Sequence, residues 1–338
     1  MSDLEREREG QRRAFAARAG WGDAAHRPLA GDASSRRYER LTRGDATAVL
    51  MDDPPPGHAV DPFVRIARLL RCMGYSAPEI FDLDEVLSFV LLEDLGDDTF
   101  SALLAGPDAS LLERTLYEAA TDVLIDLHRR PVPPDLPGYD PAWLLSDASL
   151  FLETAIGDAA DPAMAAAFEA VWRGPLEEAT RGPVVLCLRD FHAGNLMWLP
   201  ARGDGGRDTS GVGRVGLLDF QDARAGPAAY DLVSLLQDAR RDLGAGLEAA
   251  MVERYLNASP DLDEAAFRAA YAILGAQRAV RIIGVFHRLA KRDSKPAYLA
   301  HLPRLWRHLD ANLVHPSLAP VRSWFDRWVA PQDRSPAP

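Results

Sequence analysis

The chain has 338 residues, of which 47% are hydrophobic and 26% charged, a profile typical of a globular protein with one large domain or two lobes. The formal net charge of −12 argues against non-specific nucleic-acid binding, which requires a basic surface. No run of about 18 apolar residues predicts a membrane span and the charged start MSDLEREREGQRR lacks the apolar core of a secretory signal, so we expect a cytoplasmic monomer without nucleic-acid or membrane partners.

The first 95 residues are expected to form a small lobe that is mostly β-structure. The proline cluster in DDPPPG (52–57) cannot continue a strand ladder and predicts a loop. Asp61 followed by Pro62 is typical of a helix start, with Asp61 as the N-cap. The predicted elements are a charged helix over 3–19, a strand entered from the turn at Gly31, a strand over 46–51, a helix over 61–74 and a buried strand over 86–96.

Residues 96–338 are expected to form a larger, mainly helical lobe. Two short strands near 196–199 and 215–219 are joined by a glycine-rich segment, which lacks the GxxxxGK[ST] pattern of a phosphate-binding loop. The sequence therefore predicts an α+β, bilobal fold with the boundary between residues 95 and 96. Helical periodicity is found over 112–127, 141–156, 162–180, 227–243, 245–256, 263–290 and 302–313.

Polar residues crowd the entrance of an apolar run in LRDFHAGNLMW (188–198), where a strand disfavours Asp and Asn. Arg189, Asp190 and Asn195 fit the R-D-x-x-x-x-N part of a kinase catalytic loop, and Asp219-Phe220 follows where kinases carry D-F-G. Phosphoryl transfer requires a carboxylate beside the acceptor hydroxyl and oxygen ligands for Mg²⁺. We therefore expect Asp190 as the base and Asn195 and Asp219 as magnesium ligands.

Two further polar residues lie within these motifs. His192 is expected to orient the catalytic loop by hydrogen bonding, because Asp190 already fills the position of the base. Arg189, in the same motif, is predicted to be a catalytic residue together with Asp190 and His192. Asp222 adds a second carboxylate after Asp219, which could help to hold metal, order the loop or contact the substrate.

The motifs LRDFHAGN and LLDFQD resemble those of the aminoglycoside phosphotransferase and choline kinase group, with Leu188 where that group usually has histidine. The resemblance implies a protein-kinase-like fold, ATP and Mg²⁺ as cofactors, and a brace for the catalytic loop from an aspartate after the D-F motif. Asp231 occupies that place; a surface aspartate at a helix N-terminus is the alternative. Two other readings stay open, namely an aminoglycoside-resistance kinase and a pseudokinase that binds nucleotide without turnover.

A closer resemblance covers nearly the whole chain. GDASSRRYERL, VLMDDPPP, FVLLEDLGDDTF and IIGVFHRLAKRDSKPAYLAHLPRL look like the anomeric cell-wall sugar kinases, and the last block is the most specific. That family phosphorylates the C1 hydroxyl of N-acetylmuramate and N-acetylglucosamine in peptidoglycan recycling. The resemblance therefore implies a small amino sugar as the partner and substrate.

The nucleotide site must work without the lysine that protein kinases place on their third strand, because Lys291 and Lys295 are the only lysines. We expect arginine to meet part of the phosphate charge, with one of Arg36 and Arg37 pointing to solvent because successive strand residues face opposite sides. The residues predicted to contact nucleotide are Ser34, Ser35, Arg36, Arg37, Glu93 and Leu95.

A run of arginines near the C-terminus offers candidate acceptor contacts. Arg278, Arg281, Arg288 and Arg292 fall at offsets of 3, 7 and 4, so one helix face could carry all four. Guanidinium groups form bidentate pairs with carboxylates and phosphates; a solvated basic face is the alternative. Asp293 is expected to accept a hydrogen bond from a sugar hydroxyl.

Overall fold

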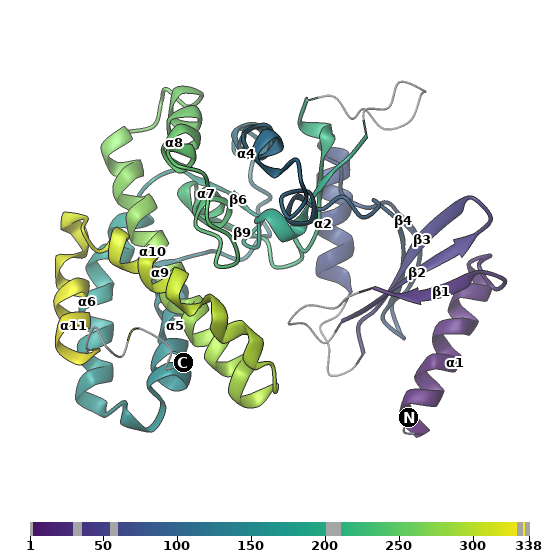
Figure 1. The fold of residues 1–338 in the computed structure, drawn as a ribbon, viewed down its shortest axis with the longest axis horizontal. Helices are drawn as coiled ribbons and strands as arrows, with labels where there is room; N and C mark the ends of the chain where they lie inside the picture. Colours follow the sequence, from purple (N-terminus) through teal and green to yellow (C-terminus); the bar gives the residue numbers. More distant parts are fainter. Residues whose placement is uncertain (1–2, 30–35, 55–59, 201–210, 330–333, 335–338) are drawn as a thin grey trace. The chain divides into compact units, whose positions relative to one another are not determined.

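The computed structural model describes residues 3–29, 36–54, 60–200, 211–329 and 334, drawn in Figure 1. The chain divides into two compact units. The N-terminal unit comprises residues 1–107 and 194–222, and the C-terminal unit comprises residues 108–193 and 223–338.

The N-terminal unit is built on a five-stranded antiparallel sheet with the strand order β1-β2-β3-β5-β4. Two inner strands, β3 and β5, are mainly apolar, as in FVLLE of β5, whereas the inner strand β2 (RYERLTR) and the first helix are rich in charged residues. The elements are α1 (Asp3–Arg18), β1 (Ala25–Pro28), β2 (Arg37–Arg43), β3 (Ala46–Asp52), α2 (Asp61–Cys72), β4 (Ile80–Asp84), β5 (Phe89–Glu93) and α3 (Phe100–Leu103).

Helix α1 packs on one face of this sheet. Phe15 and Ala16 of α1 are fully buried against Leu41, Leu50 and Phe89 of the strands, and the rings of Phe15 and Phe89 stack with centroids 5.6 Å apart. Phenylalanine buries a large apolar area. These contacts explain how a helix of such charged composition is held: Phe15 and Ala16 face the sheet, whereas Leu4 near the start of the helix is exposed.

A hairpin distant in sequence completes the N-terminal unit. Strands β7 (Leu196–Trp198) and β8 (Val215–Leu217) pair antiparallel, which confirms the two predicted short strands. Isolated bridges join Ser76 to Gly216 and Thr99 to Met197. A Cβ at Gly216 would come within 2.9 Å of the Met197 Cβ, so glycine is required at this close approach. The hairpin thus belongs to the N-terminal unit. The predicted division between residues 95 and 96 places it in the C-terminal lobe instead.

The C-terminal unit is mainly helical and contains one two-stranded sheet, β6 with β9. The predicted small β-rich part and larger helical part are therefore confirmed. The elements of the C-terminal unit are α4 (Ala109–Leu127), α5 (Pro141–Phe151), α6 (Pro162–Ala179), β6 (Val184–Cys187), β9 (Arg224–Pro227), α7 (Ala229–Leu236), α8 (Leu247–Asn257), α9 (Glu264–Arg292), α10 (Leu302–Asn312) and α11 (Ala319–Trp328), with a π-helical turn over Leu152–Ile156.

Helix α9 is the centre of this unit and packs against α5, α6, α7 and α10 (Figure 1). A Cβ at Gly284 would lie 2.8 Å from the backbone of Leu150, so a glycine allows α9 to approach α5 closely. By length and composition α9 could cross a membrane, but 67% of its most apolar window is buried inside the protein. That burial is typical of a core helix.

Several element boundaries differ from those predicted; for example, the strand predicted over 86–96 is confined to β5 (Phe89–Glu93). The helix predicted over 227–243 is confined to α7, because Arg224–Pro227 pairs with β6 as β9 and the chain leaves the helix at Gln237. The N-cap of α2 is Val60, without a side-chain cap, so the prediction of Asp61 as the cap is wrong by one residue. Asp61 lies in the first turn, where its negative charge still stabilises the helix by interacting with the positive end of the helix dipole.

Candidate active site

The loop that carries Asp190 is anchored by one buried carboxylate from α7. Asp231 is fully buried, and its two oxygens accept hydrogen bonds from the backbone N–H groups of Leu188 at 2.6 Å and Arg189 at 2.8 Å. The pKa of Asp231 is raised to about 7, because burial outweighs the lowering effects of these two donors and of Arg278. These are the contacts that a loop brace requires, and they act on the two residues directly before Asp190.

Each of the two motifs contains a residue in a strained backbone conformation. Arg189 has φ of 71° and Asp219 has φ of 57°, in the left-handed region that non-glycine residues rarely adopt. Such strain persists only where surrounding contacts hold it, and it is common at functional sites. The Arg189 guanidinium lies 4.7 Å from the centroid of the Trp143 ring on α5, which adds a second anchor to the loop.

Asp190 lies in a positively charged environment within the C-terminal unit. Burial raises the pKa of Asp190, but the positive charges of Arg281, Arg278 and Arg189 together outweigh this effect. The pKa of Asp190 is therefore below its ordinary value. Asp190 is therefore ionised at neutral pH. An ionised carboxylate can accept a hydrogen bond from an acceptor hydroxyl and orient it for attack.

The two arginines of α9 that influence Asp190 are held by partners that sequence analysis did not identify. Arg278 is buried and donates to the Ser234 hydroxyl at 2.5 Å, while Arg281 pairs with Asp147 of α5 at 2.6 Å. A fixed guanidinium loses less entropy when it binds an anion than a mobile one. No local pattern marks Asp147 or Ser234, since each is remote in sequence from its arginine.

Arg288 and Arg292 share α9 with these two residues but lie much further along it. At a rise of about 1.5 Å per residue, Arg292 lies about 21 Å along the axis from Arg278, too far for both to contact one small sugar. Arg292 is also bonded to Asp293, with Nε and Oδ1 2.9 Å apart. The four arginines therefore do not form one acceptor site, and Asp293 lies beside Arg292 at that distal end.

His192 is buried in the loop. Its Nε2 lies 3.5 Å from an Arg240 guanidinium nitrogen, and its backbone N–H donates to the Asp190 carbonyl at 3.1 Å. Burial lowers the pKa of His192, with Arg240 adding to this effect and Asp238 opposing it. The imidazole contacts Arg240 outside the loop while the backbone of His192 bonds within it, an arrangement suited to orienting the loop, so the predicted role stays a prediction.

Asn195 and Asp219 meet within the N-terminal unit. The Asn195 amide nitrogen lies 3.4 Å from an Asp219 carboxylate oxygen, because β7 starts just after Asn195 and β8 ends just before Asp219. Phe220 stacks on Phe63 of α2 with centroids 5.1 Å apart, which fixes the strand end. Amide and carboxylate oxygens are ligands that Mg²⁺ prefers, and Mg²⁺ usually takes only one or two of them from protein. The pair fits such a metal.

One arginine directly before β2 lies near Tyr38, whose surroundings also include Asp219. Arg36 is buried and its Nε lies 3.3 Å from an Asp53 oxygen, whereas the side chain of Arg37 is exposed. Burial raises the pKa of Tyr38 to about 12, with Arg36 lowering it and Asp219 raising it, so both charges lie near this phenol. Arg36 is thus the better phosphate candidate of the two. Ser34 and Ser35 lie outside the described residues.

We expect Arg36→Ala to raise the KM for ATP about 10- to 100-fold, the effect of losing a charge-assisted hydrogen bond or two. Arg37→Ala is the matched control and should leave this KM within about twofold, because an exposed charge contributes little. Initial rates over a range of ATP concentrations, with melting curves for both variants, test this. An unchanged KM in Arg36→Ala would contradict the assignment.

Three other residues are predicted to contact the nucleotide or the substrate. Glu93 lies 3.4 Å from an Arg71 guanidinium nitrogen and accepts the Glu79 backbone N–H at 3.0 Å. Leu95 packs near the hairpin, since its Cδ1 would lie 3.1 Å from a Cβ at Gly216. Asp222 is exposed. Their roles in ligand binding stay predictions.

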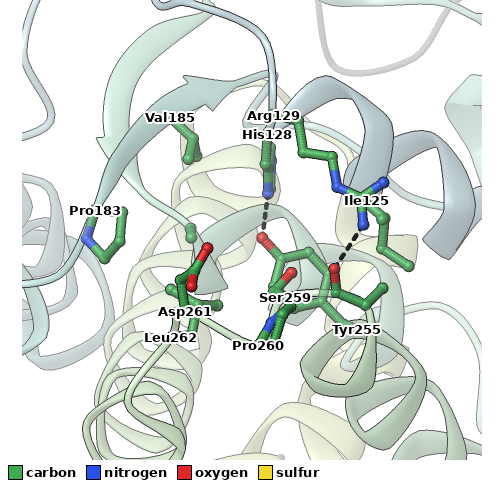
Figure 2. A pocket seen from close by; sticks show the side chains of 12 residues that line it. Ile125, His128, Arg129, Pro183, Val185, Tyr255, Ser259, Pro260, Asp261 and Leu262 are labelled. Atoms are coloured by element: carbon green, nitrogen blue, oxygen red, sulfur yellow. Dashed lines mark hydrogen bonds between the residues drawn. The ribbon is translucent and has the colours of Figure 1, made fainter.

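A cavity of about 360 Å³ in the C-terminal unit has a different lining (Figure 2). His128 at the end of α4 and Tyr255 of α8 share a hydrogen bond of 2.7 Å in its wall. Burial lowers the pKa of His128 to about 3, so its imidazole is neutral. No residue predicted to act in catalysis lines this cavity, which therefore lies apart from the predicted site.

Comparison with known proteins supports the motif analysis. A model of the phosphotransferase enzyme family matches residues 25–268. The N-acetylmuramate/N-acetylglucosamine kinase of Caulobacter vibrioides is 40% identical, in an alignment covering 98% of this chain and 99% of that protein. The protein of the same name from Pseudomonas aeruginosa is 33% identical, covering 89% of this chain and 88% of that protein.

Solved structures agree on the fold. A choline/ethanolamine kinase family protein from Mesorhizobium loti superimposes with a TM-score of 0.62 at 14% identity, covering 94% of this chain and 98% of that one. At this identity the likeness shows the fold alone. It confirms the predicted bilobal, protein-kinase-like class.

Proposed function

This chain belongs to the phosphotransferase enzyme family and is an ATP-dependent phosphotransferase; from that premise we propose that it transfers the γ-phosphoryl group to the C1 hydroxyl of N-acetylmuramate and N-acetylglucosamine. The observation that carries the proposal is the 40% identity, over almost the full length of both chains, to a kinase named for these two sugars. We further propose that it acts as a cytoplasmic monomer in the recycling of cell-wall sugars.

In this reaction Asp190 would accept a hydrogen bond from the acceptor hydroxyl and take its proton as the phosphoryl group is transferred. Its low pKa makes it a modest base, so positioning is its larger contribution. Positioning is supported by the hydrogen bonds that the backbone N–H groups of Leu188 and Arg189 donate to Asp231, because they fix the backbone immediately before Asp190. A hemiacetal hydroxyl is more acidic than an ordinary sugar alcohol, so a modest base suffices.

The nucleotide phosphates would be held by the N-terminal unit. Asn195 and Asp219 would bind Mg²⁺, which neutralises phosphate charge when bound. Arg36 would supply the charge that lysine supplies in protein kinases. Asp190 and Asn195 belong to one sequence motif, which ties the two groups of residues to one reaction.

The charge around Asp190 bears on the alternative acceptors. Arg278, Arg281 and Arg189 all lower the pKa of Asp190, so its surroundings are positive. A polycationic aminoglycoside would be repelled there, whereas a neutral or anionic sugar would not. The environment therefore favours an amino sugar that is N-acetylated, in which the amine charge is absent.

We expect the enzyme to phosphorylate N-acetylglucosamine but not its methyl glycoside or its C1-reduced alcohol. A site that hydrogen-bonds a substrate hydroxyl rejects analogues that lack it by large factors, about 10⁴ or more. Transfer from labelled ATP across this panel, followed by phosphorus NMR of the product, tests the position of phosphate. Phosphate at C6, or equal rates with the methyl glycoside, would contradict the anomeric reaction. Kanamycin is included as the polycationic comparison.

A further inference from the structure

Arg240 lies in the segment that follows α7 and is held beside the catalytic loop. Its guanidinium nitrogen Nη1 lies 3.5 Å from His192 Nε2 and 3.9 Å from Asp238 Oδ1. Its backbone N–H also donates to the same Asp238 oxygen at 3.0 Å, and Asp238 is buried. Asp238 therefore positions both ends of Arg240, and His192 is two residues from Asp190.

Arg240 differs in exposure from the arginines that set the charge at Asp190. Arg278 and Arg189 are 4% and 7% exposed, and each packs on an aromatic ring. The side chain of Arg281 is 18% exposed beside Asp147. The side chain of Arg240 is 33% exposed. Arg240 is thus more accessible than any of these three arginines.

On the basis of the function proposed above, we propose that Arg240 binds the carboxylate that N-acetylmuramate carries and N-acetylglucosamine lacks. Guanidinium matches carboxylate geometry with two parallel hydrogen bonds, and a partly exposed one can reach a ligand without losing its anchor. The positive surroundings of Asp190 add long-range attraction for an anionic acceptor. Arg240 therefore raises kcat/KM for the anionic sugar relative to the neutral one.

The test is the ratio of kcat/KM for N-acetylmuramate to that for N-acetylglucosamine. In Arg240→Gln this ratio should fall about 10- to 100-fold, as expected for a lost charge-assisted hydrogen bond. Arg240→Lys should restore part of the ratio, because it keeps the charge but not the bidentate geometry. Raising the salt concentration should lower the ratio in the unmodified enzyme more than in Arg240→Gln.

Arg307→Gln is the matched control. Arg307 lies on α10 with a side chain 61% exposed and pairs with Asp242, so the substitution makes the same charge change at a surface pair and should leave the ratio unaltered. Equal losses for both sugars in Arg240→Gln would mean that Arg240 only positions the loop and would overturn the inference, as would an unchanged ratio. If the unmodified enzyme phosphorylates neither sugar, the proposed function itself fails, and the inference with it.

Discussion

Replacing Asp190 with asparagine should lower kcat by about 10²- to 10⁴-fold, the usual contribution of a positioned general base. Asparagine keeps the shape of the side chain but cannot take the proton of the acceptor hydroxyl. The KM for ATP should change little, because the predicted phosphate contacts belong to the N-terminal unit. Steady-state rates with saturating sugar and ATP, together with calorimetric nucleotide binding, measure both effects.

Asp158→Asn is the matched control for Asp190→Asn. Asp158 is exposed and lies in the same unit, so its substitution should leave kcat within about twofold, as for most surface changes. Melting curves are needed because Asp190 balances nearby arginines, and a lost balance could destabilise the fold. If folded Asp190→Asn retained more than a tenth of the turnover, Asp190 would not be the base.

Replacing Asp219 with asparagine should raise the Mg²⁺ concentration for half-maximal activity at least about tenfold, because even outer-shell changes cost 10- to 100-fold in metal affinity. A hard divalent cation prefers a charged carboxylate to a neutral amide. Asp219 has φ of 57°, and asparagine tolerates this left-handed region well, so backbone strain does not confuse the result. A Mg²⁺ titration at fixed ATP gives the shift.

Asp45→Asn supplies the comparison for the magnesium experiment. Asp45 is an exposed residue of the same unit, in the turn between β2 and β3, and its loss should not move the Mg²⁺ midpoint. Excess Mg²⁺ should restore much of the activity of Asp219→Asn, since the remaining ligands still bind the metal weakly. An unshifted midpoint would show that Asp219 does not contact the ion.

The sequence by itself determined the class of fold and the positions of the two motifs. Their residue types and spacing are local properties: R-D-x-x-x-x-N is one loop, and a hairpin is the shortest route that returns Asp219 to Asn195. The contact between Asn195 and Asp219 is therefore the one that spacing alone predicts. The long helix near the C-terminus was likewise predicted, because its apolar periodicity extends over many turns.

Only the tertiary structure decided which side chains share an environment. Alternation along a strand requires one of Arg36 and Arg37 to face outward, but only packing identifies Arg36 as the buried one. Helical spacing places four arginines on one face, yet the axial rise separates Arg292 from Arg278. The ion pair of Arg281 with Asp147 joins residues far apart in the chain.

The contacts of Asp231 with the catalytic loop and of Arg240 with His192 were also decided by the tertiary structure. Asp231 meets residues more than 40 positions before it, and Arg240 meets His192 across 48 positions. Periodicity and turn chemistry report on neighbours within a few residues, whereas these bonds form only after β6, β9 and α7 have packed together. Burial then sets the charge state of each group, and burial is a property of the folded chain.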